Sequence, residues 1–229
     1  MGITKASAKP MGLVPLEQPV QRAERVYSAL LGSILRGETG SGAQLNTDII
    51  SQHLRVSTTP VRDALNRLEK DGLVVKLPYQ GWFVRSFQEA EIRDVYEMRT
   101  GLERFSVRLA CARITPEEIE RLHATQLVGE AALQDQDLEA YRLYNQELHA
   151  AIMRAARNAE LAQLAAQASL KTQMLSAKTI RLLGRPPIAL QEHRQLIELI
   201  AKRETQLAQE LMERHILSAM EDIFRHGLR

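Results

Sequence analysis

Strand-forming sequence is confined to one short segment of this chain, and this restriction limits the folds open to it. Leu73–Leu77 and Trp82–Arg85 are rich in apolar, β-branched and aromatic residues, and Pro78–Gly81 lies between them as a turn. Elsewhere apolar residues recur at helical spacing. Aromatic residues make up only 4% of the chain, so the core depends on Leu, Ile, Val, Ala and Met, a set that favours helices. The sequence therefore predicts a mainly α fold with one β-hairpin.

Three helices are predicted before the hairpin, and a tight turn separates the second from the third. They are expected at about Gln21–Leu35, Thr47–Leu54 and Thr58–Asp71, with Gly72 ending the last. Two helices joined by a tight turn and followed by a hairpin are the parts of a winged helix-turn-helix with a two-stranded wing. We assign this N-terminal domain to residues 20–86 and expect residues 1–19 to form a disordered tail.

From about residue 87 onward every periodic segment is typical of a helix. Thr115–Glu118 forms a capping box with proline at the first helical position, which is a strong signal for a helix start. We expect residues 87–229 to form an all-α helical-bundle ligand-binding domain. Its helices are predicted at about Glu89–Arg113, Pro116–Leu133, Asp137–Ala156, Glu160–Ile180, Ile188–Lys202 and Glu204–Arg225, with a break at Gly184–Pro187.

Charge and cysteine content narrow the class of protein further. The formal net charge is +2, but residues 1–85 carry a net +4 and the remainder a net −2, which is typical of a nucleic-acid-binding head on a slightly acidic body. The single cysteine, Cys111, cannot form an internal disulfide, so we expect a cytoplasmic location. No stretch is long and apolar enough to predict a membrane span.

The N-terminal motif resembles the DNA-binding head of the GntR family of transcription regulators. The resemblance rests on Leu54–Leu65, Leu68-Glu69, Asp71–Val74 and Gly81–Val84. The rest of the chain resembles the FCD ligand-binding domain found in the fatty-acid-regulator branch of that family. Together the two resemblances cover about residues 20–225, and they imply a homodimer in the cytoplasm that binds a double-stranded DNA operator.

DNA contacts are expected from the first turns of the third helix and from the wing. A helix placed in the major groove reads base edges with its first turns, and Arg62 is the best candidate because its planar fork can engage guanine. Glycine at the end of the wing turn allows a close approach to the DNA backbone. The predicted DNA-binding residues are Thr58, Thr59, Arg62, Lys76, Tyr79, Gln80 and Gly81.

Two departures from the family's pattern affect the predicted operator. The family often has arginine where this chain has Thr58, and a Glu-Arg pair where it has Thr47-Asp48. Asp48 near DNA would repel phosphate unless it faces a cytosine or an arginine. The resemblance therefore implies DNA binding, but not the operator sequence of better-known relatives.

The resemblance also implies a metal site in the helical domain. Histidines scattered over helices are more often core or surface residues than ligands, and spacing alone leaves that alternative open. The metal-binding FCD pattern has an Asp or Asn, a His four residues later, and one His on each of the last two helices. The matching positions are Asn145, His149, His193 and His215. Imidazole ligands suit zinc first, with nickel, copper or iron also compatible.

A carboxylate effector is the expected guest of such a site. Neutral ligands leave the charge of a divalent cation uncancelled, and this charge attracts an anion. Arg99 and Glu103 match an Arg and a Glu of the first FCD helix, and Arg99 could clamp the effector's carboxylate. The alternative is a helix-surface ion pair at i,i+4.

The sequence predicts a regulator and not an enzyme. It contains no HExxH motif, nucleophile elbow or phosphate-binding loop. Glu147 and Glu192 neighbour the histidines, but adjacent helix positions are expected to point elsewhere. The alternatives are a regulator whose metal is purely structural or is itself the signal, with no organic effector, and a metal-dependent hydrolase.

Overall fold

The N-terminal head contains the three helices and the hairpin that the sequence predicts. The computed structural model describes residues 19–177 and 185–226, so the predicted tail lies outside the described residues except for Pro19, which opens the first helix. A short strand, β1, adds to the predicted two-stranded hairpin, and the sheet order is β1-β3-β2 with antiparallel pairing. The elements are α1 (Pro19–Leu35), β1 (Gln44–Leu45), α2 (Thr47–Leu54), α3 (Thr58–Lys70), β2 (Val74–Leu77) and β3 (Gly81–Val84).

Buried aliphatic residues of α1, α3 and the sheet form the core of the head. Val61, Leu65 and Leu68 line the inner face of α3 and are fully buried, as their helical spacing predicts. The Tyr27 hydroxyl of α1 donates a hydrogen bond to Asp71 (2.7 Å), and the Arg67 guanidinium lies 3.8 Å from the Tyr27 ring centroid. These contacts hold α1 against α3, so that the outer face of α3 remains free for a partner.

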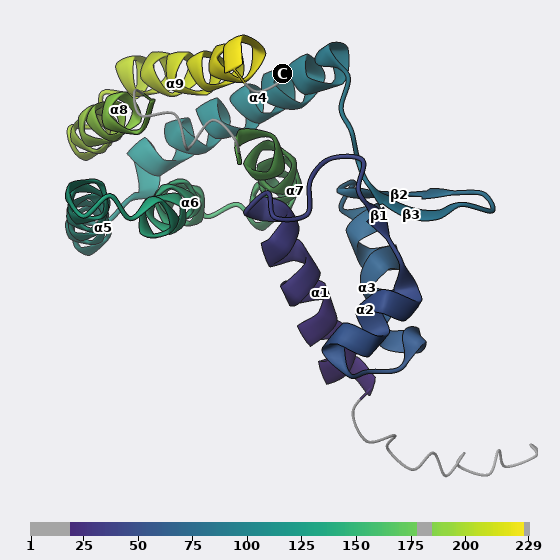
Figure 1. Ribbon diagram of the computed structural model, residues 1–229. Coiled ribbons are helices and arrows are strands. Elements are labelled where there is room, and N and C mark those ends of the chain that lie inside the picture. Colours follow the sequence, from purple (N-terminus) through teal and green to yellow (C-terminus); the bar gives the residue numbers. More distant parts are fainter. Residues whose placement is uncertain (1–18, 178–184, 227–229) are drawn as a thin grey trace, which may run out of the picture.

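The C-terminal domain is an all-helical bundle arranged around α4 (Figure 1). Helix α4 packs against α6, α7, α8 and α9, and α5 packs against α6 and α8. The predicted fold class, a winged helix-turn-helix followed by a helical bundle, is confirmed. The bundle helices are α4 (Glu89–Arg113), α5 (Pro116–Gln134), α6 (Leu138–Ala155), α7 (Ala159–Ser176), α8 (Arg185–Ala201) and α9 (Thr205–His226).

Sequence signals place most of the bundle's helix ends. Thr115 and Glu118 form the predicted capping box at the start of α5, and Asn158 caps α7 by accepting from the Leu161 amide. Helix α8 begins at Arg185, so Pro186 and Pro187 occupy its first turn instead of a break between helices. The last residues of the helix predicted at 160–180 lie outside the described range.

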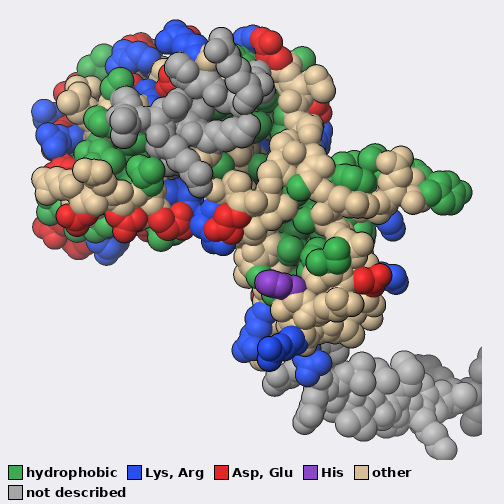
Figure 2. All heavy atoms as spheres, in the orientation of Figure 1, with side chains coloured by type: hydrophobic (Ala, Val, Ile, Leu, Met, Phe, Trp, Pro, Cys, Tyr) green, Lys and Arg blue, Asp and Glu red, His purple; other side chains and the backbone are tan. Residues whose placement is uncertain are grey.

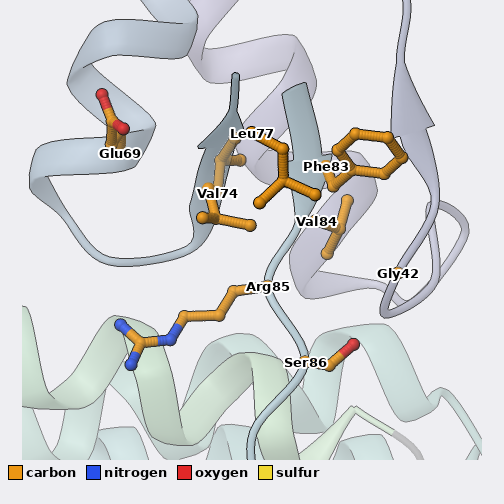
Figure 3. Close-up of a pocket in the computed structure, with 9 residues that line it drawn as sticks. Gly42, Glu69, Val74, Leu77, Phe83, Val84, Arg85 and Ser86 are labelled. Atoms are coloured by element: carbon orange, nitrogen blue, oxygen red, sulfur yellow. The ribbon is translucent and has the colours of Figure 1, made fainter. Parts of the chain in front are cut away.

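The head and the bundle meet at the linker after β3 and at α7. The Ser41 hydroxyl donates to the Arg85 carbonyl (3.1 Å), while the Arg85 guanidinium pairs with Glu91 of α4 (2.6 Å). Figure 3 shows this arginine extending from the end of β3 beside an open hollow of about 620 Å³. From the bundle, Leu170 and Met174 of α7 pack against the core of the head.

The molecular surface matches the charge asymmetry of the sequence. Figure 2 shows Lys and Arg side chains gathered at the end of the head that lies far from the bundle, whereas acidic and basic side chains alternate on the visible face of the bundle. In the part of the chain that the structure describes, no helix combines the length and the hydropathy that crossing a bilayer requires.

Two glycines in bundle helices give a paired prediction about packing. A Cβ at Gly129 of α5 would lie 2.5 Å from the ring of buried Tyr144, whereas a Cβ at Gly101 of α4 would meet nothing within 4 Å. Gly129→Ala should therefore lower the free energy of unfolding by about 1–3 kcal/mol, because the ring must shift in a packed core. Gly101→Ala should raise it by about 0.5–1 kcal/mol through helix propensity. Urea denaturation followed by circular dichroism measures both, and equal effects would contradict the packing described here.

Candidate metal centre

Three histidines from three helices meet inside the bundle. His149 lies on α6, His193 on α8 and His215 on α9, and their exposed fractions are 7%, 0% and 6%. One ring nitrogen of each lies within 4.8 Å of the corresponding nitrogens of the other two. The Nε2 atoms of His193 and His215 are 3.2 Å apart. Helix packing thus gathers three imidazole donors that lie far apart in the sequence.

Outer hydrogen bonds set the protonation of two of these rings. The Nδ1 atom of His215 lies 2.7 Å from a carboxylate oxygen of Glu192, which can only accept, so Nδ1 carries the proton. Tyr144 donates its hydroxyl proton to the Gln126 side-chain oxygen (2.6 Å) and therefore accepts from Nδ1 of His193 (2.9 Å). Protons on both Nδ1 atoms leave both Nε2 atoms with lone pairs directed at the same space.

These donors fit a divalent cation. Two unprotonated Nε2 atoms at 3.2 Å repel each other unless a positive charge lies near both. Both ring nitrogens of His149 are buried without a hydrogen bond, although Nδ1 lies 3.3 Å from Glu103 Oε1. Unpaired buried nitrogens cost free energy, and a metal ion would satisfy them. Imidazole donors with outer hydrogen-bond partners suit zinc and the neighbouring transition metals better than magnesium or calcium.

Burial favours the neutral forms of His193 and His215, and the neutral form is the one that binds metal. It lowers the pKa of His215 to about 4, although Glu192 opposes the shift. Burial and then the neighbouring rings lower the pKa of His193 well below its ordinary value. For Glu103 burial acts in the opposite direction, but the neighbouring His149 and Arg99 outweigh it and lower the pKa of this carboxyl to about 2.

The predicted fourth ligand and the predicted effector residues lie close to this cluster in the fold. Asn145 is half-buried one helical turn before His149 on α6, and its role as a ligand stays a prediction. Arg99 and Glu103 form an ion pair on α4 (3.2 Å), and Arg99 also donates to Thr172 of α7 (3.1 Å). Their side chains are only 13% and 5% exposed, so the alternative of a helix-surface pair is wrong. Their role in effector binding stays a prediction.

Sequence reasoning missed the outer partners of the histidines. Glu192 was expected to point away from the site, and this expectation is wrong. Helix α9 packs against α8 and brings His215 to Glu192. Tyr144 and Gln126 carried no signal either, because their contact with the site depends on how α5, α6 and α8 pack together.

A cavity of about 700 Å³ lies between α6 and α7 and reaches the histidine cluster. His149 and Glu103 form part of its wall, and Gln146 contributes a side-chain nitrogen that is buried without a hydrogen bond. The volume falls within the range of small-molecule sites in proteins. His149 is therefore the residue shared by the histidine cluster and this cavity.

The predicted DNA-binding residues lie on two exposed features of the head. Thr59 and Arg62 are exposed in the first turns of α3, and Thr58 is half-buried there. At the wing tip Tyr79 is fully exposed with a φ of 61°, and Gly81 has a φ of 94° that favours glycine. Lys76 and Gln80 are exposed on the same hairpin. Asp48 is exposed in the first turn of α2.

A winged helix-turn-helix joined to a helical bundle of this kind defines a DNA-binding transcription regulator. Residues 22–84 match the family described as bacterial regulatory proteins, gntR family, and residues 94–218 match the FCD domain. The chain belongs to the GntR family, in the group whose C-terminal domain is of the FCD type.

Similar proteins include several named regulators. The Nta operon transcriptional regulator of Aminobacter aminovorans is 34% identical over 120 residues, which are 52% of this chain and 57% of that protein. The transcriptional repressor GlaR of Escherichia coli K12 is 24% identical over 200 residues, covering 84% and 91% of the two chains. The structure of E. coli McbR/YncC matches with a TM-score of 0.80 at 19% identity over 90% of this chain and 98% of that chain, which shows the shared fold.

These families and relatives are transcription regulators, in agreement with the prediction that the chain is not an enzyme. The metal-dependent hydrolase alternative is therefore set aside.

The outer hydrogen bond to His193 gives a prediction for metal affinity. Tyr144→Phe removes the acceptor for Nδ1–H of His193, and the loss of such outer partners weakens metal binding by roughly 10- to 100-fold. The matched control is Tyr141→Phe on the same helix, since this buried tyrosine donates to the Pro186 carbonyl (3.2 Å). Zinc titration of the chelator-treated variants measures the difference. Equal zinc affinities in the two variants would contradict the assigned role of Tyr144.

Proposed function

We propose that this transcription regulator binds one divalent metal ion, zinc by first choice, and senses a small carboxylate at that metal. Asn145, His149, His193 and His215 would hold the ion, which would supply a positive charge for the ligand to bind. The observation that carries the proposal is His149, whose two ring nitrogens are buried without hydrogen bonds at the wall of a 700 Å³ cavity. A buried group of this kind needs a partner that enters from outside the fold.

The charges around the cluster support an anionic effector. An amide and three neutral imidazoles cancel none of the charge of a divalent cation. The Glu103 carboxylate beside His149 is already matched by Arg99 on the same helix. A carboxylate entering beside these groups would gain a charge-assisted interaction in a site with little water.

Helix α7 offers a route from this ligand to the DNA-binding head. Leu170 lines the cavity and also packs against the core of the head, and Met174 packs there one turn further along. Thr172, between them, accepts a hydrogen bond from Arg99 beside the candidate centre. A ligand between α6 and α7 would therefore bias the position of α7 and, with it, the orientation of the head.

Operator binding would use two heads of a homodimer. Recognition helices on two subunits read half-sites about one helical turn apart, so a change in head orientation alters the fit to both. Since the DNA of a bacterium lies in its cytoplasm, we infer a cytoplasmic location for the regulator.

The experiment that tests the proposal measures operator affinity with and without each ligand. Selection from random duplexes supplies the operator, and fluorescence anisotropy compares chelator-treated protein, zinc-loaded protein, and zinc-loaded protein with small organic acids. We expect an acid to change the affinity at least about fivefold, and only when zinc is present. Acid responses that persist in His149→Ala would overturn the proposal, as would a metal that changes affinity with no response to any acid.

Arg62→Ala should weaken binding to the selected operator by roughly 10- to 100-fold, because Arg62 is exposed in the first turns of α3 and can reach a base edge. Arg93→Ala, which removes an exposed arginine from α4 of the bundle, is the control and should leave affinity within about twofold. The same anisotropy assay measures both. An Arg62 variant that binds as tightly as the Arg93 variant would remove Arg62 from the interface.

Met174→Ala should separate ligand binding from the DNA response. The side chain contacts the core of the head and does not line the cavity, so acid affinity should be unchanged while the acid-induced change in operator affinity shrinks severalfold. Leu164→Ala on the exposed face of α7 is the control and should keep the full response. A Met174 variant with an intact response would show that α7 does not carry the signal.

A further inference from the structure

The cavity beside the candidate metal centre has unsatisfied polar groups in the part next to the histidine cluster, which we call its polar end. Across the described residues, four side-chain atoms are buried without a hydrogen bond: Oε2 of Glu103, Nε2 of Gln146 and both ring nitrogens of His149. All three residues line this cavity, and Glu103 is only 4% exposed. Unsatisfied polar groups therefore gather where the cavity meets the histidine cluster.

Most of the other residues that line the cavity are apolar. Leu143 and Met153 of α6 face Ala162, Ala165 and Leu170 of α7 across the cavity. The alanines occupy little volume, so the space between the two helices stays open. Such walls reward a hydrocarbon group and offer no partner to a hydroxyl or a charge.

The polar residues farther along the cavity are already paired with one another. Arg154 forms an ion pair with Glu147, and both residues lie on α6. The Gln173 side-chain amide of α7 donates to the Ser169 hydroxyl (2.9 Å). A second carboxylate on the ligand would compete with Glu147 for Arg154, whose side chain is 61% exposed, or remain unpaired against the apolar wall.

We infer that the cavity binds a monocarboxylate with a hydrocarbon body, in preference to a dicarboxylate or a polyhydroxylated acid. The carboxylate occupies the polar end, where the Gln146 amide donates to one of its oxygens. The hydrocarbon body extends between α6 and α7, against the helix that packs on the head. This inference rests on the proposed function, because it takes the carboxylate end to lie at the metal centre.

Pairs of acids with equal chain length test the inference. Isothermal titration of the zinc-loaded full chain compares hexanoate with adipate and octanoate with suberate, with gluconate as a six-carbon polyol acid and acetate as the bare carboxylate. Each methylene buried against the wall strengthens binding by up to about fourfold. We expect octanoate to bind more tightly than hexanoate, and each monocarboxylate to bind at least about tenfold more tightly than its dicarboxylate partner.

A pair of variants on α7 locates the hydrocarbon body. Ala166→Glu places a carboxylate at an exposed position that lines the cavity, whereas Gln163→Glu adds the same charge at an exposed position of α7 outside the lining. Ala166→Glu should weaken octanoate binding at least about tenfold and leave acetate binding within about twofold. Gln163→Glu should leave both within about twofold. Equal octanoate affinities in the two variants would show that the chain does not lie along this wall.

The outcomes separate this inference from the proposed function. If acetate, adipate and gluconate bind as tightly as octanoate, the inference is wrong and the carboxylate–metal proposal stands. If octanoate binds equally well with zinc and after chelation, the hydrocarbon site stands and the carboxylate–metal proposal fails. If no acid binds the zinc-loaded protein, both fail.

Discussion

Convergence of three buried imidazoles is the constraint on which the rest of the helical domain depends. His149, His193 and His215 come from α6, α8 and α9. Two of them donate Nδ1–H hydrogen bonds to Glu192 and Tyr144, and these bonds turn their Nε2 atoms toward the same space. Neutral donors at this spacing are stable together only with a positive charge between them. Under the proposed function, the cluster would tie the bundle's packing to the binding of a cation. His149, whose ring nitrogens are buried without a hydrogen bond, also lines the cavity between α6 and α7.

Contacts among the described residues connect this cluster to the DNA-binding head. Arg99 pairs with Glu103 beside His149 and donates to Thr172 of α7, while Leu170 of the same helix touches both the cavity and the core of the head. A second connection runs through Arg85 in the linker. These described contacts come from α7 and the linker, and under the proposed function a displacement of α7 would bias how the head is held. A mainly apolar cavity against that helix gives a ligand the means to do so.

Much of the fold could be predicted from the sequence because its signals are local. The capping box at Thr115 and the apolar stripe of Val61, Leu65 and Leu68 place helices and their inner faces without reference to the rest of the chain. Strand β1 was missed because two residues carry no periodicity, and they form a strand only by pairing with β3. The proline-rich start of α8 was read as a break, since prolines are compatible with both a loop and a first helical turn.

For the candidate site, too, some residues could be predicted from the sequence and others could not. The three histidines could be named from a family pattern, but Tyr144, Gln126 and Glu192 could not, because each meets the cluster through packing between helices.

The most direct test of the central claim is an anomalous difference map from crystals of the zinc-loaded protein, recorded at the zinc absorption edge. The account predicts one strong peak per chain within bonding distance of Nε2 of His149, His193 and His215. A map with no peak there, or with the histidines joined by direct hydrogen bonds while zinc lies elsewhere, would contradict it.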